Sequence, residues 1–595
     1  MKKIILPIGA LLFSGFAHGQ LSQSENYVYT KTYLSDPSGA QPKVSETVQY
    51  VDGLGRPKQV ISIKGSPSGK DIVTPIVYDE FGRQRRDYLP VPQSSTSNGT
   101  IYGQTSGQVD FPVGDPQGIY TNEKAFSEKI LENSPLDKIL EQKQVGAAWQ
   151  TKPVKFDYGT NAAGDVRKYI TVSSTVENSI HSVLKVSGSG DSDNGYYPAV
   201  QLYKNSVKDE DDNETIEFKN GKGQVILVRK VVSATENADT YYIYNEYGQL
   251  AFVVPPKAAV LAKALTTGTT ISDPVLNDLC YQYRYDGKGR LVEKKLPGKG
   301  WEEMVYNKAD LLILSRDARL KAGIDGFTPA NSWHFIKYDS FGREAYTGIS
   351  IDSRPRHEIQ ASVENASAAV YEQRRFTVEL SGLTAEYSNF VYPTSMSKLL
   401  TVTYYDKYPT LPAEVTIPAN VITSDQTVLP DTDGAVRSTK GLPVASFVKN
   451  IEDDNWTKTF SWYDKKGRVV GTHSVNHLGG YTKTESLLNF SGLAERTNTY
   501  HLRKQGEVGV FVTEGFVYDN QNRLLQHYHK VDDKPEVVLG DYAYNELSQL
   551  STKSLGSGLQ SINYNYNIKG WLTDINKDQM TVPDLNGKLF AYKIE

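Results

Sequence analysis

Tyr78-Asp79-Glu80-Phe81-Gly82-Arg83 is the first intact copy of a six-residue phrase that recurs along this chain. The phrase reads tyrosine, aspartate or asparagine, two variable residues, glycine, then arginine or glutamine. With 39 tyrosines and 48 glycines among 595 residues, chance predicts on the order of 0.03 copies. The recurrence therefore predicts a repeat architecture. Intact copies begin at Tyr78, Tyr244, Tyr285, Tyr338 and Tyr463.

Each position of the phrase suits the tip of a β-hairpin. Tyrosine suits the end of a strand, with one ring face packed and the hydroxyl in water. Aspartate or asparagine opens a turn by bonding the backbone two residues on. Glycine supplies the positive φ that such a turn needs, and arginine or glutamine starts the return strand. We therefore expect structural turn roles for Tyr78, Asp79, Gly82, Arg83, Tyr244, Asn245, Gly248, Tyr285, Asp286, Gly289, Arg290, Tyr338, Asp339, Gly342, Arg343, Tyr463, Asp464, Gly467 and Arg468.

Degenerate copies extend the array. Asn522 and Ser548 replace the glycine in two of them, and a positive φ is tolerated by asparagine but suits serine less well. Neighbouring copies are about 20 residues apart, which is the length of two strands and two turns, so the repeats predict a hairpin ribbon. These copies begin at Tyr50, Phe218, Tyr306, Tyr518, Tyr544 and Tyr566.

The composition bounds the class of protein. The length exceeds one ordinary core, so a repeat array or several modules are expected. A net charge of −4 and a pI near 6.2 leave no basic footprint, so nucleic acid is not an expected partner. The lone cysteine, Cys280, allows no intrachain disulfide and is expected to pack as a small apolar residue.

Residues 1–19 resemble a secretory signal peptide. Lys2 and Lys3 precede a short apolar stretch, and Ala17-His18-Gly19 places small residues before Gln20. That stretch is too short to span a bilayer, and no later stretch predicts a membrane span. We expect export to the extracellular space, the cell surface or the periplasm.

The chain divides by its patterns into six regions. We expect a signal peptide (1–19), an N-terminal module (20–150), a β-rich connecting module (151–240), repeats (241–350), an insertion with helix and loops (351–445) and further repeats (446–595). Strands are predicted at 27–33, 44–51 and 59–63, and helices at 122–141, opened by Thr121 or Asn122, at 256–265 and at 355–374.

The repeats resemble the YD repeats of the RHS family of large secreted bacterial proteins. Residues 283–298, Thr403-Tyr404-Tyr405-Asp406 and residues 565–572 look like signature runs of one RHS subgroup. The phrase at 132–149 is similar to a domain of unknown function that precedes RHS repeats in that subgroup. The resemblance implies a mainly β fold, in which the hairpin ribbon winds into a hollow, here partial, shell with a smaller N-terminal β-rich module and a few short helices. In many relatives a downstream segment seals the shell and a toxin is held inside.

This chain departs from that pattern at its C-terminal end, which reads as a strand in Leu589-Phe590-Ala591-Tyr592-Lys593. We therefore expect an incomplete, open shell without an assignable toxin. Unpaired strand edges around 562–572 and 588–594 would then bind protein cargo or a partner.

No residue pattern predicts catalysis, a cofactor or a metal. Gly65-Ser66-Pro67-Ser68-Gly69 has proline where a nucleophile would stand, and the oxygen clusters at 191–195 and 431–434 lack EF-hand spacing. The histidine pairs 473/477 and 527/529 lack a third ligand. The favoured function is a secreted, non-enzymatic shell or scaffold. The alternatives are a surface glycan-binding or adhesive protein, whose aromatic rings would stack on sugars, and a hydrolase, which would need a convergent acid/base pair.

Overall fold

A computed structural model describes residues 21–22, 25–103, 113–121, 123–188, 195–326, 328–366, 369–432 and 434–594. One antiparallel sheet of 35 strands dominates, and β23 and β24 form a separate two-stranded sheet. The expected mainly β fold is confirmed. The expected signal peptide lies outside the described residues.

The strands follow one another closely along the chain. The first part contains β1 (Asn26–Tyr33), β2 (Val44–Val51), β3 (Pro57–Ile63), β4 (Ile72–Val77), β5 (Arg86–Tyr88), β6 (Val91–Pro92), β7 (Phe126–Leu131), β8 (Ile139–Lys143), β9 (Val154–Thr160), β10 (Tyr169–Val176) and β11 (Ser179–Val186). The middle contains β12 (Tyr203–Lys208), β13 (Glu214–Lys219), β14 (Val225–Val231), β15 (Asn237–Tyr244), β16 (Leu250–Val254), β17 (Tyr281–Tyr285), β18 (Leu291–Lys295), β19 (Trp301–Tyr306), β20 (Leu312–Arg316), β21 (Ser332–Tyr338), β22 (Glu344–Ile351), β23 (Val378–Leu380) and β24 (Leu383–Ala385). The last part contains β25 (Lys398–Tyr405), β26 (Pro443–Lys449), β27 (Trp456–Tyr463), β28 (Val469–Val475), β29 (Gly479–Leu488), β30 (Ala494–Lys504), β31 (Val510–Tyr518), β32 (Leu524–Val531), β33 (Val537–Tyr544), β34 (Leu550–Leu555), β35 (Gln560–Tyr566), β36 (Leu572–Ile575) and β37 (Tyr592–Lys593).

The ribbon is a meander in which each strand pairs with the next. From β12 to β22, and again from β25 to β37, every strand is hydrogen-bonded to its neighbour in sequence. Strand direction alternates in such a meander, so alternate turns lie at the same edge of the ribbon. The turns formed by the repeated phrase are these alternate turns. They therefore share one edge.

The hairpin β10–β11 leaves the meander, since β9 pairs directly with β12. It lies along the wall formed by later strands, where Ile180 pairs with Tyr285 of β17. Its tip reaches α4 (Arg356–Asn365), because the Arg356 guanidinium donates to Ser179 Oγ at 2.7 Å. The hairpin thus joins distant parts of the ribbon.

The helices are short. α1 (Pro256–Lys263) begins with proline in its first turn and buries Ala258 and Ala262, which confirms the helix expected at 256–265. α4 covers only the first half of the helix expected at 355–374. The other two α-helices of the described residues are α2 (Asp273–Leu279) and α3 (Ala318–Ala322).

The helix expected at 122–141 is wrong. β7, β8 and the turn between them occupy most of this stretch and form a hairpin whose turn contains Asp137 at φ 50°. β7 also pairs with β5, so both of its edges are hydrogen-bonded. The hydrogen bonds that β7 forms with β5 and β8 outweigh the local helix propensity of this segment, because tertiary pairing can override propensity.

Buried side chains form three clusters, and one of them joins the two ends of the chain. The largest lies around β19–β28 with Trp333 and Trp462 fully buried, and a second surrounds α1 and Cys280. The packed, apolar Cys280 is as expected. The third cluster belongs to the N-terminal module, yet Leu547 and Ile568 pack against it.

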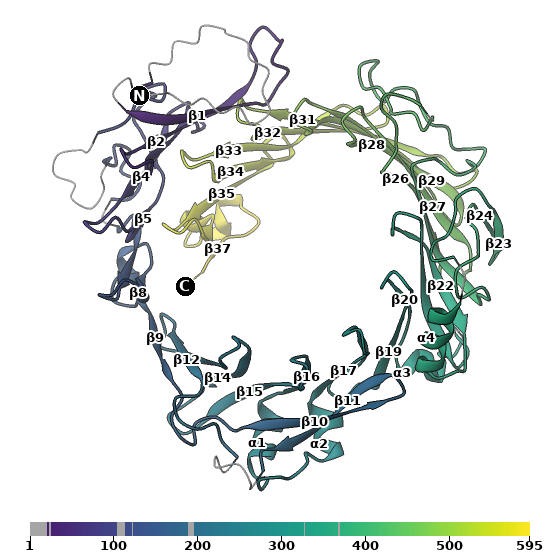
Figure 1. Ribbon diagram of the computed structural model, residues 1–595. Coiled ribbons are helices and arrows are strands. Elements are labelled where there is room, and N and C mark those ends of the chain that lie inside the picture. Colours follow the sequence, from purple (N-terminus) through teal and green to yellow (C-terminus); the bar gives the residue numbers. More distant parts are fainter. Residues whose placement is uncertain are drawn as a thin grey trace.

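The ribbon curves round into a ring (Figure 1). β1 and β2 lie beside β31 and β32, and the C-terminal strands lie within the outline of the ring in this view. Lys43 Nζ donates to Asp519 O at 3.1 Å, and Gln521 Nε2 donates to Val44 O at 3.3 Å. The two ends of the ribbon therefore meet through side chains, while among the described residues no strand of the N-terminal module pairs with a strand of the C-terminal end, which fits the expected partial shell.

The expected free strand edge at 562–572 is also wrong, because β35 pairs with β34 on one side and with β36 on the other. β36 in turn pairs with the short β37. Across the described ranges, the helices are all too short to cross a bilayer.

Candidate functional site: the hairpin-tip edge

The repeated phrase builds one turn geometry, seen clearly in the tip between β17 and β18. Asp286 Oδ1 accepts hydrogen bonds from the backbone N–H groups of Lys288 and Arg290, each at 2.9 Å. Its Oδ2 accepts from Arg290 Nε at 2.7 Å. The Gly289 N–H donates to Asp286 O at 3.0 Å. One carboxylate thus holds the whole tip.

The predicted positive φ of the phrase glycines is confirmed. The values are 77° at Gly82, 79° at Gly248, 81° at Gly289, 75° at Gly342 and 76° at Gly467. In the degenerate copies the same position is also left-handed, at Asp310 (58°), Asn522 (62°) and Ser548 (63°).

The residue that opens the turn and the residue four positions later form a matched pair of side chains. Where the turn opens with aspartate, arginine stands four residues later and forms an ion pair with it. Where it opens with asparagine, glutamine can stand there, and Asn245 Nδ2 donates to Gln249 Oε1 at 2.8 Å. The Asp–Arg pairs are 52/56, 79/83, 286/290, 339/343, 464/468 and 519/523, and the Asn–Gln pairs are 220/224, 245/249 and 545/549.

The arginine or glutamine also reaches the next tip along the edge. Arg290 Nη1 bonds Asp310 Oδ1 at 2.7 Å, and Arg523 Nη1 donates to Ser548 Oγ at 2.6 Å. Asp310 and Ser548 are the left-handed residues of their own turns. Further contacts of this kind join Arg83 to Asp137, Arg343 to Asp406, Arg468 to Asn489 O and Phe490 O, and Gln224 to Gly248 O.

In seven tips, from the one at Tyr285 to the one at Tyr566, the tyrosine reaches back to the preceding tip. Tyr285 Oη donates to Leu250 O at 2.8 Å, and Tyr306 Oη donates to Leu291 O at 2.7 Å. Each accepting carbonyl belongs to the first residue of a return strand, where a bulge interrupts the ladder. The same bond links Tyr338 to Leu312, Tyr463 to Pro443, Tyr518 to Ala494, Tyr544 to Leu524 and Tyr566 to Leu550.

The structure adds two details to the phrase as expected from the sequence. The tyrosine hydroxyl of these tips donates to a backbone carbonyl, and burial raises the pKa of Tyr285 and Tyr306. Arg290 lies inside the turn, and β18 starts one residue later, at Leu291. The matched Asp–Arg and Asn–Gln pairs were the sequence signal that could have revealed the arginine's role.

The last tips of the ribbon close the ring against the N-terminal module. Ser68 Oγ donates to both oxygens of Glu546 at 2.8 Å, and Lys70 Nζ lies 3.1 Å from Glu546 Oε1. Lys569 Nζ lies 3.7 Å from the centroid of the Trp149 ring. We call these contacts, with those of Lys43 and Gln521, the closing seam.

The electrostatics of the seam favour a charged Glu546. Partial burial alone would raise the pKa of Glu546, but hydrogen bonds from Ser66, Ser68 and Lys70 outweigh it and hold that pKa below its usual range. The seam therefore contains one carboxylate that acts as an acceptor for three neighbours.

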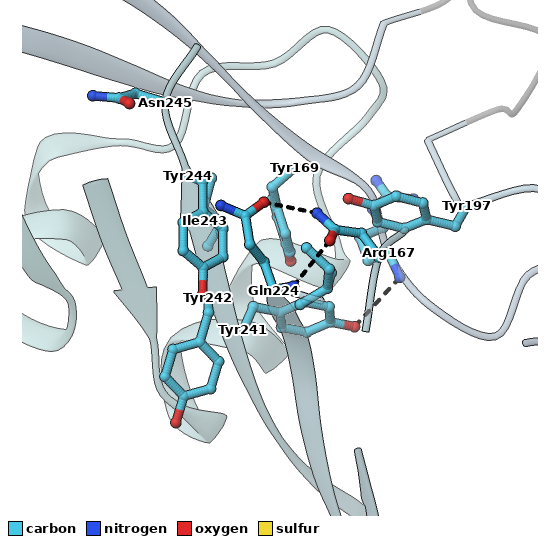
Figure 2. Close-up of a pocket in the computed structure, with 11 residues that line it drawn as sticks. Arg167, Tyr169, Tyr197, Gln224, Tyr241, Tyr242, Ile243, Tyr244 and Asn245 are labelled. Carbon is cyan, nitrogen blue, oxygen red and sulfur yellow. Dashed lines mark hydrogen bonds between the residues drawn. The ribbon is translucent and has the colours of Figure 1, made fainter. Parts of the chain in front are cut away.

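A small polar cavity lies beside β14 and β15, with a volume of about 170 Å³. Tyr169 and Tyr241 meet edge to face there, with ring centroids 5.0 Å apart, and the Arg167 N–H donates to Tyr241 Oη at 3.4 Å (Figure 2). Small-molecule sites usually enclose roughly 300–1,000 Å³. The cavity is below that range, and its tyrosines pack against one another, so it gives no support to a glycan site.

The structure places the other sequence candidates apart. His473 is buried in β28, and His527 Nε2 lies 3.0 Å from Glu514 Oε1. Within the described ranges, no three His, Cys, Asp or Glu side chains gather as a metal site would require. Most of the oxygen cluster at 191–195, and Asp433 of the second cluster, lie outside the described residues.

Comparison with known proteins supports the fold. A family model described as a domain of unknown function (DUF6443) matches residues 23–160. No curated protein matches the chain. A Tc holotoxin pore structure from Photorhabdus luminescens matches 92% of this chain with a TM-score of 0.52 at 11% identity. A TcdB2–TccC3 crystal structure matches 93% of it with a TM-score of 0.39 at 10% identity, covering 25% of that chain. This chain spans 21% of the length of the holotoxin chain.

Proposed function

We propose that this chain is an exported, non-enzymatic RHS-repeat protein that forms the wall of a shell and encloses or presents another polypeptide. The observation that carries the proposal is the closing seam, through which the last hairpin tips dock on the N-terminal module. Because the two ends of the same chain contact each other, a single chain can form the complete ring of the wall without a partner.

Three further observations support the proposal. The repeated tips are joined to each other by tyrosine and arginine contacts, which stiffen the edge of the ribbon. The fold is similar to that of a Tc holotoxin pore chain at a TM-score of 0.52. The match of residues 23–160 to a domain of unknown function coincides with the N-terminal module on which the seam forms. Export is inferred from residues 1–19 alone.

Enclosure predicts protection of whatever is attached at the C-terminal end, which lies within the outline of the ring (Figure 1). The test fuses an unstructured, protease-sensitive peptide after the last residue and follows its cleavage. The matched control inserts the same peptide into the exposed turn at residues 36–39, between β1 and β2. We expect slow cleavage of the C-terminal fusion and rapid cleavage of the insertion. Equal cleavage rates would contradict enclosure.

A second variant separates enclosure from simple burial of the peptide. Glu546→Lys places a cation opposite Lys70 and should open the closing seam. If the wall protects the fused peptide, this variant should restore rapid cleavage while its circular dichroism stays β-rich. Protection that persists in the opened variant would argue for direct binding of the peptide to a strand.

A further inference from the structure

A buried lysine, a buried glutamate and a partly exposed asparagine meet where the insertion after α4 packs on β21. Lys337 and Glu372 have side chains with no exposed surface, and Lys337 Nζ lies 3.0 Å from Glu372 Oε1. The same Nζ donates to Asn389 Oδ1 and, at 2.7 Å, to Val391 O. An amine therefore touches a side-chain carboxamide beside a carboxylate, out of contact with water.

We propose that Lys337 and Asn389 form an intramolecular isopeptide bond, with Glu372 as the group that transfers the protons. The bond would join Lys337 Nζ to Asn389 Cγ. It would tie the insertion covalently to the wall of the ring. This inference is independent of the proposed function.

The lysine is placed to act as a nucleophile. Only an uncharged amine can attack a carbonyl carbon, and an uncompensated ammonium is costly to bury. Burial lowers the pKa of Lys337 to about 8 even though Glu372 opposes this. The Tyr346 ring lies 5.3 Å from Nζ and helps to keep the site dry. The amine form is thus accessible near neutral pH.

Glu372 is held rigidly against both reactants. Its Oε2 accepts from the backbone N–H of Phe390 at 3.0 Å and from Ser388 Oγ at 2.5 Å. Its Oε1 accepts from the Val391 N–H at 3.1 Å, beside its contact with Lys337. These bonds run to the residues on either side of Asn389, so they also fix the carboxamide. Such fixed proximity is the main source of rate in intramolecular reactions.

The oxygen and the nitrogen of the Asn389 carboxamide point in different directions, and both orientations suit the reaction. Its oxygen faces Lys337, whereas its nitrogen donates to Thr394 O at 2.8 Å near the surface. The leaving nitrogen is therefore on the side that solvent can reach. Asn389 itself is partly exposed, unlike Lys337 and Glu372.

The reaction balances without an outside reagent. Glu372 takes one proton from the Lys337 ammonium, and the free amine attacks Asn389 Cγ to form the new N–C bond. Glu372 passes that first proton to the carboxamide nitrogen and then takes the second proton from Nζ, and the C–N bond of the carboxamide breaks. Glu372 finally gives the second proton to the released ammonia, so the carboxylate is regenerated. The sum is one amide formed, one amide lost and one ammonia released, which leaves as ammonium. No electron transfer is involved.

Peptide mapping of the purified full-length protein tests the bond. Trypsin should leave a branched peptide that joins residues 322–343 to residues 376–398, lighter than the sum of the two by one ammonia, because it cannot cleave after an acylated lysine. Intact mass alone would not decide, because a chain that begins at Gln20 after removal of residues 1–19 also loses ammonia when its N-terminal glutamine cyclises. Lys449 is an internal control, because the contacts of its largely buried side chain are with backbone carbonyls, Asp454 and the Trp456 ring, and not with a carboxamide.

Three variants give distinct expected results. Lys337→Met should yield the unlinked 376–398 peptide. Asn389→Asp should still give a branched peptide, lighter than the sum of its two parts by one water instead of one ammonia. Glu372→Gln, which keeps the side-chain size, should leave both peptides unlinked in a folded protein. Separate peptides 322–337 and 376–398 from the unmodified protein would overturn the proposal, and a linked peptide in Glu372→Gln would overturn the role given to Glu372.

Discussion

Asp310 stands at the left-handed position of its turn, at φ 58°, and its carboxylate binds Arg290 of the preceding tip at 2.7 Å. A residue with a side chain is strained in this conformation by roughly 1–2 kcal/mol relative to glycine. Most copies of the phrase have glycine there. In this copy the position instead supplies a contact between neighbouring hairpins.

Substitution of Asp310 should separate strain from contact. Asp310→Ala keeps the strained backbone and loses the ion pair, so we expect a loss of about 1 kcal/mol in the free energy of unfolding. Asp310→Gly loses the same ion pair but removes the strain, so it should stay within about 0.5 kcal/mol of the parent protein. Urea unfolding followed by tryptophan fluorescence measures both. A larger loss for glycine than for alanine would contradict this account.

The matched turn pairs predict a rescue by double substitution. Asp464 is buried and accepts from the Lys466 and Arg468 N–H groups and from Arg468 Nε. Asp464→Asn should cost about 1–3 kcal/mol because it removes a charge-assisted bond from Arg468. Adding Arg468→Gln recreates the pair seen at Asn220 and Gln224.

The double variant should therefore be more stable than Asp464→Asn alone. Gln224 also donates to the next tip, at Gly248 O, as Arg468 does to Asn489 O, so the replacement keeps a donor at the contact with the next tip. A double-mutant cycle by urea unfolding measures the coupling. Strictly additive losses would show that the two side chains do not act as a pair.

The tyrosine contact predicts a cost for removing one hydroxyl. Tyr306→Phe leaves the carbonyl of Leu291, at the bulge, without its donor, so we expect a loss of about 1 kcal/mol. Tyr247, in the tip between β15 and β16, is 69% exposed, and Tyr247→Phe should change stability by less than about 0.5 kcal/mol. Thermal unfolding of the two variants compares them directly. Equal shifts would argue against the tyrosine contact.

The tips were predictable from the sequence because their interactions are local. Asp286, Gly289 and Arg290 lie within one turn, so all the residues that interact there belong to the same six-residue phrase. The β7–β8 hairpin was not predictable in this way, because its strands are stabilised by partners such as β5 that lie far away in the sequence. A helix was expected there from local composition alone.

The closing seam has no local signal at all. Ser68 and Glu546 are 478 residues apart in the chain, and neither residue type is unusual for an exposed turn. The group formed by Lys337, Glu372 and Asn389 has no local sequence signal either, because each residue comes from a different segment and no spacing relates them. Such sites depend on how the ribbon curves and where its insertion packs, which the repeated phrase does not determine.

The closing seam should loosen in acid. The pKa of Glu546 is lower in the folded protein than in the unfolded chain, so its contribution to stability is fully present above the unfolded value of about 4.3. That contribution is lost as the pH falls through the lowered folded value, because the protonated carboxyl no longer attracts Lys70. Opening should therefore begin below about pH 4.3 and not on the alkaline side.

Hydrogen exchange measures this opening. The exchange rates of residues 65–71 and 545–549, corrected for intrinsic rates, should increase below that pH. Glu546→Gln should show fast exchange in both segments at all pH values between 3 and 7, without a pH-dependent transition. Glu536→Gln is the control, because Glu536 lies in an exposed turn at the opposite edge of the ribbon. This variant should behave as the parent protein does. A parent protein whose seam exchanges equally at both ends of this pH range would show that the Glu546 contacts do not hold the ring closed.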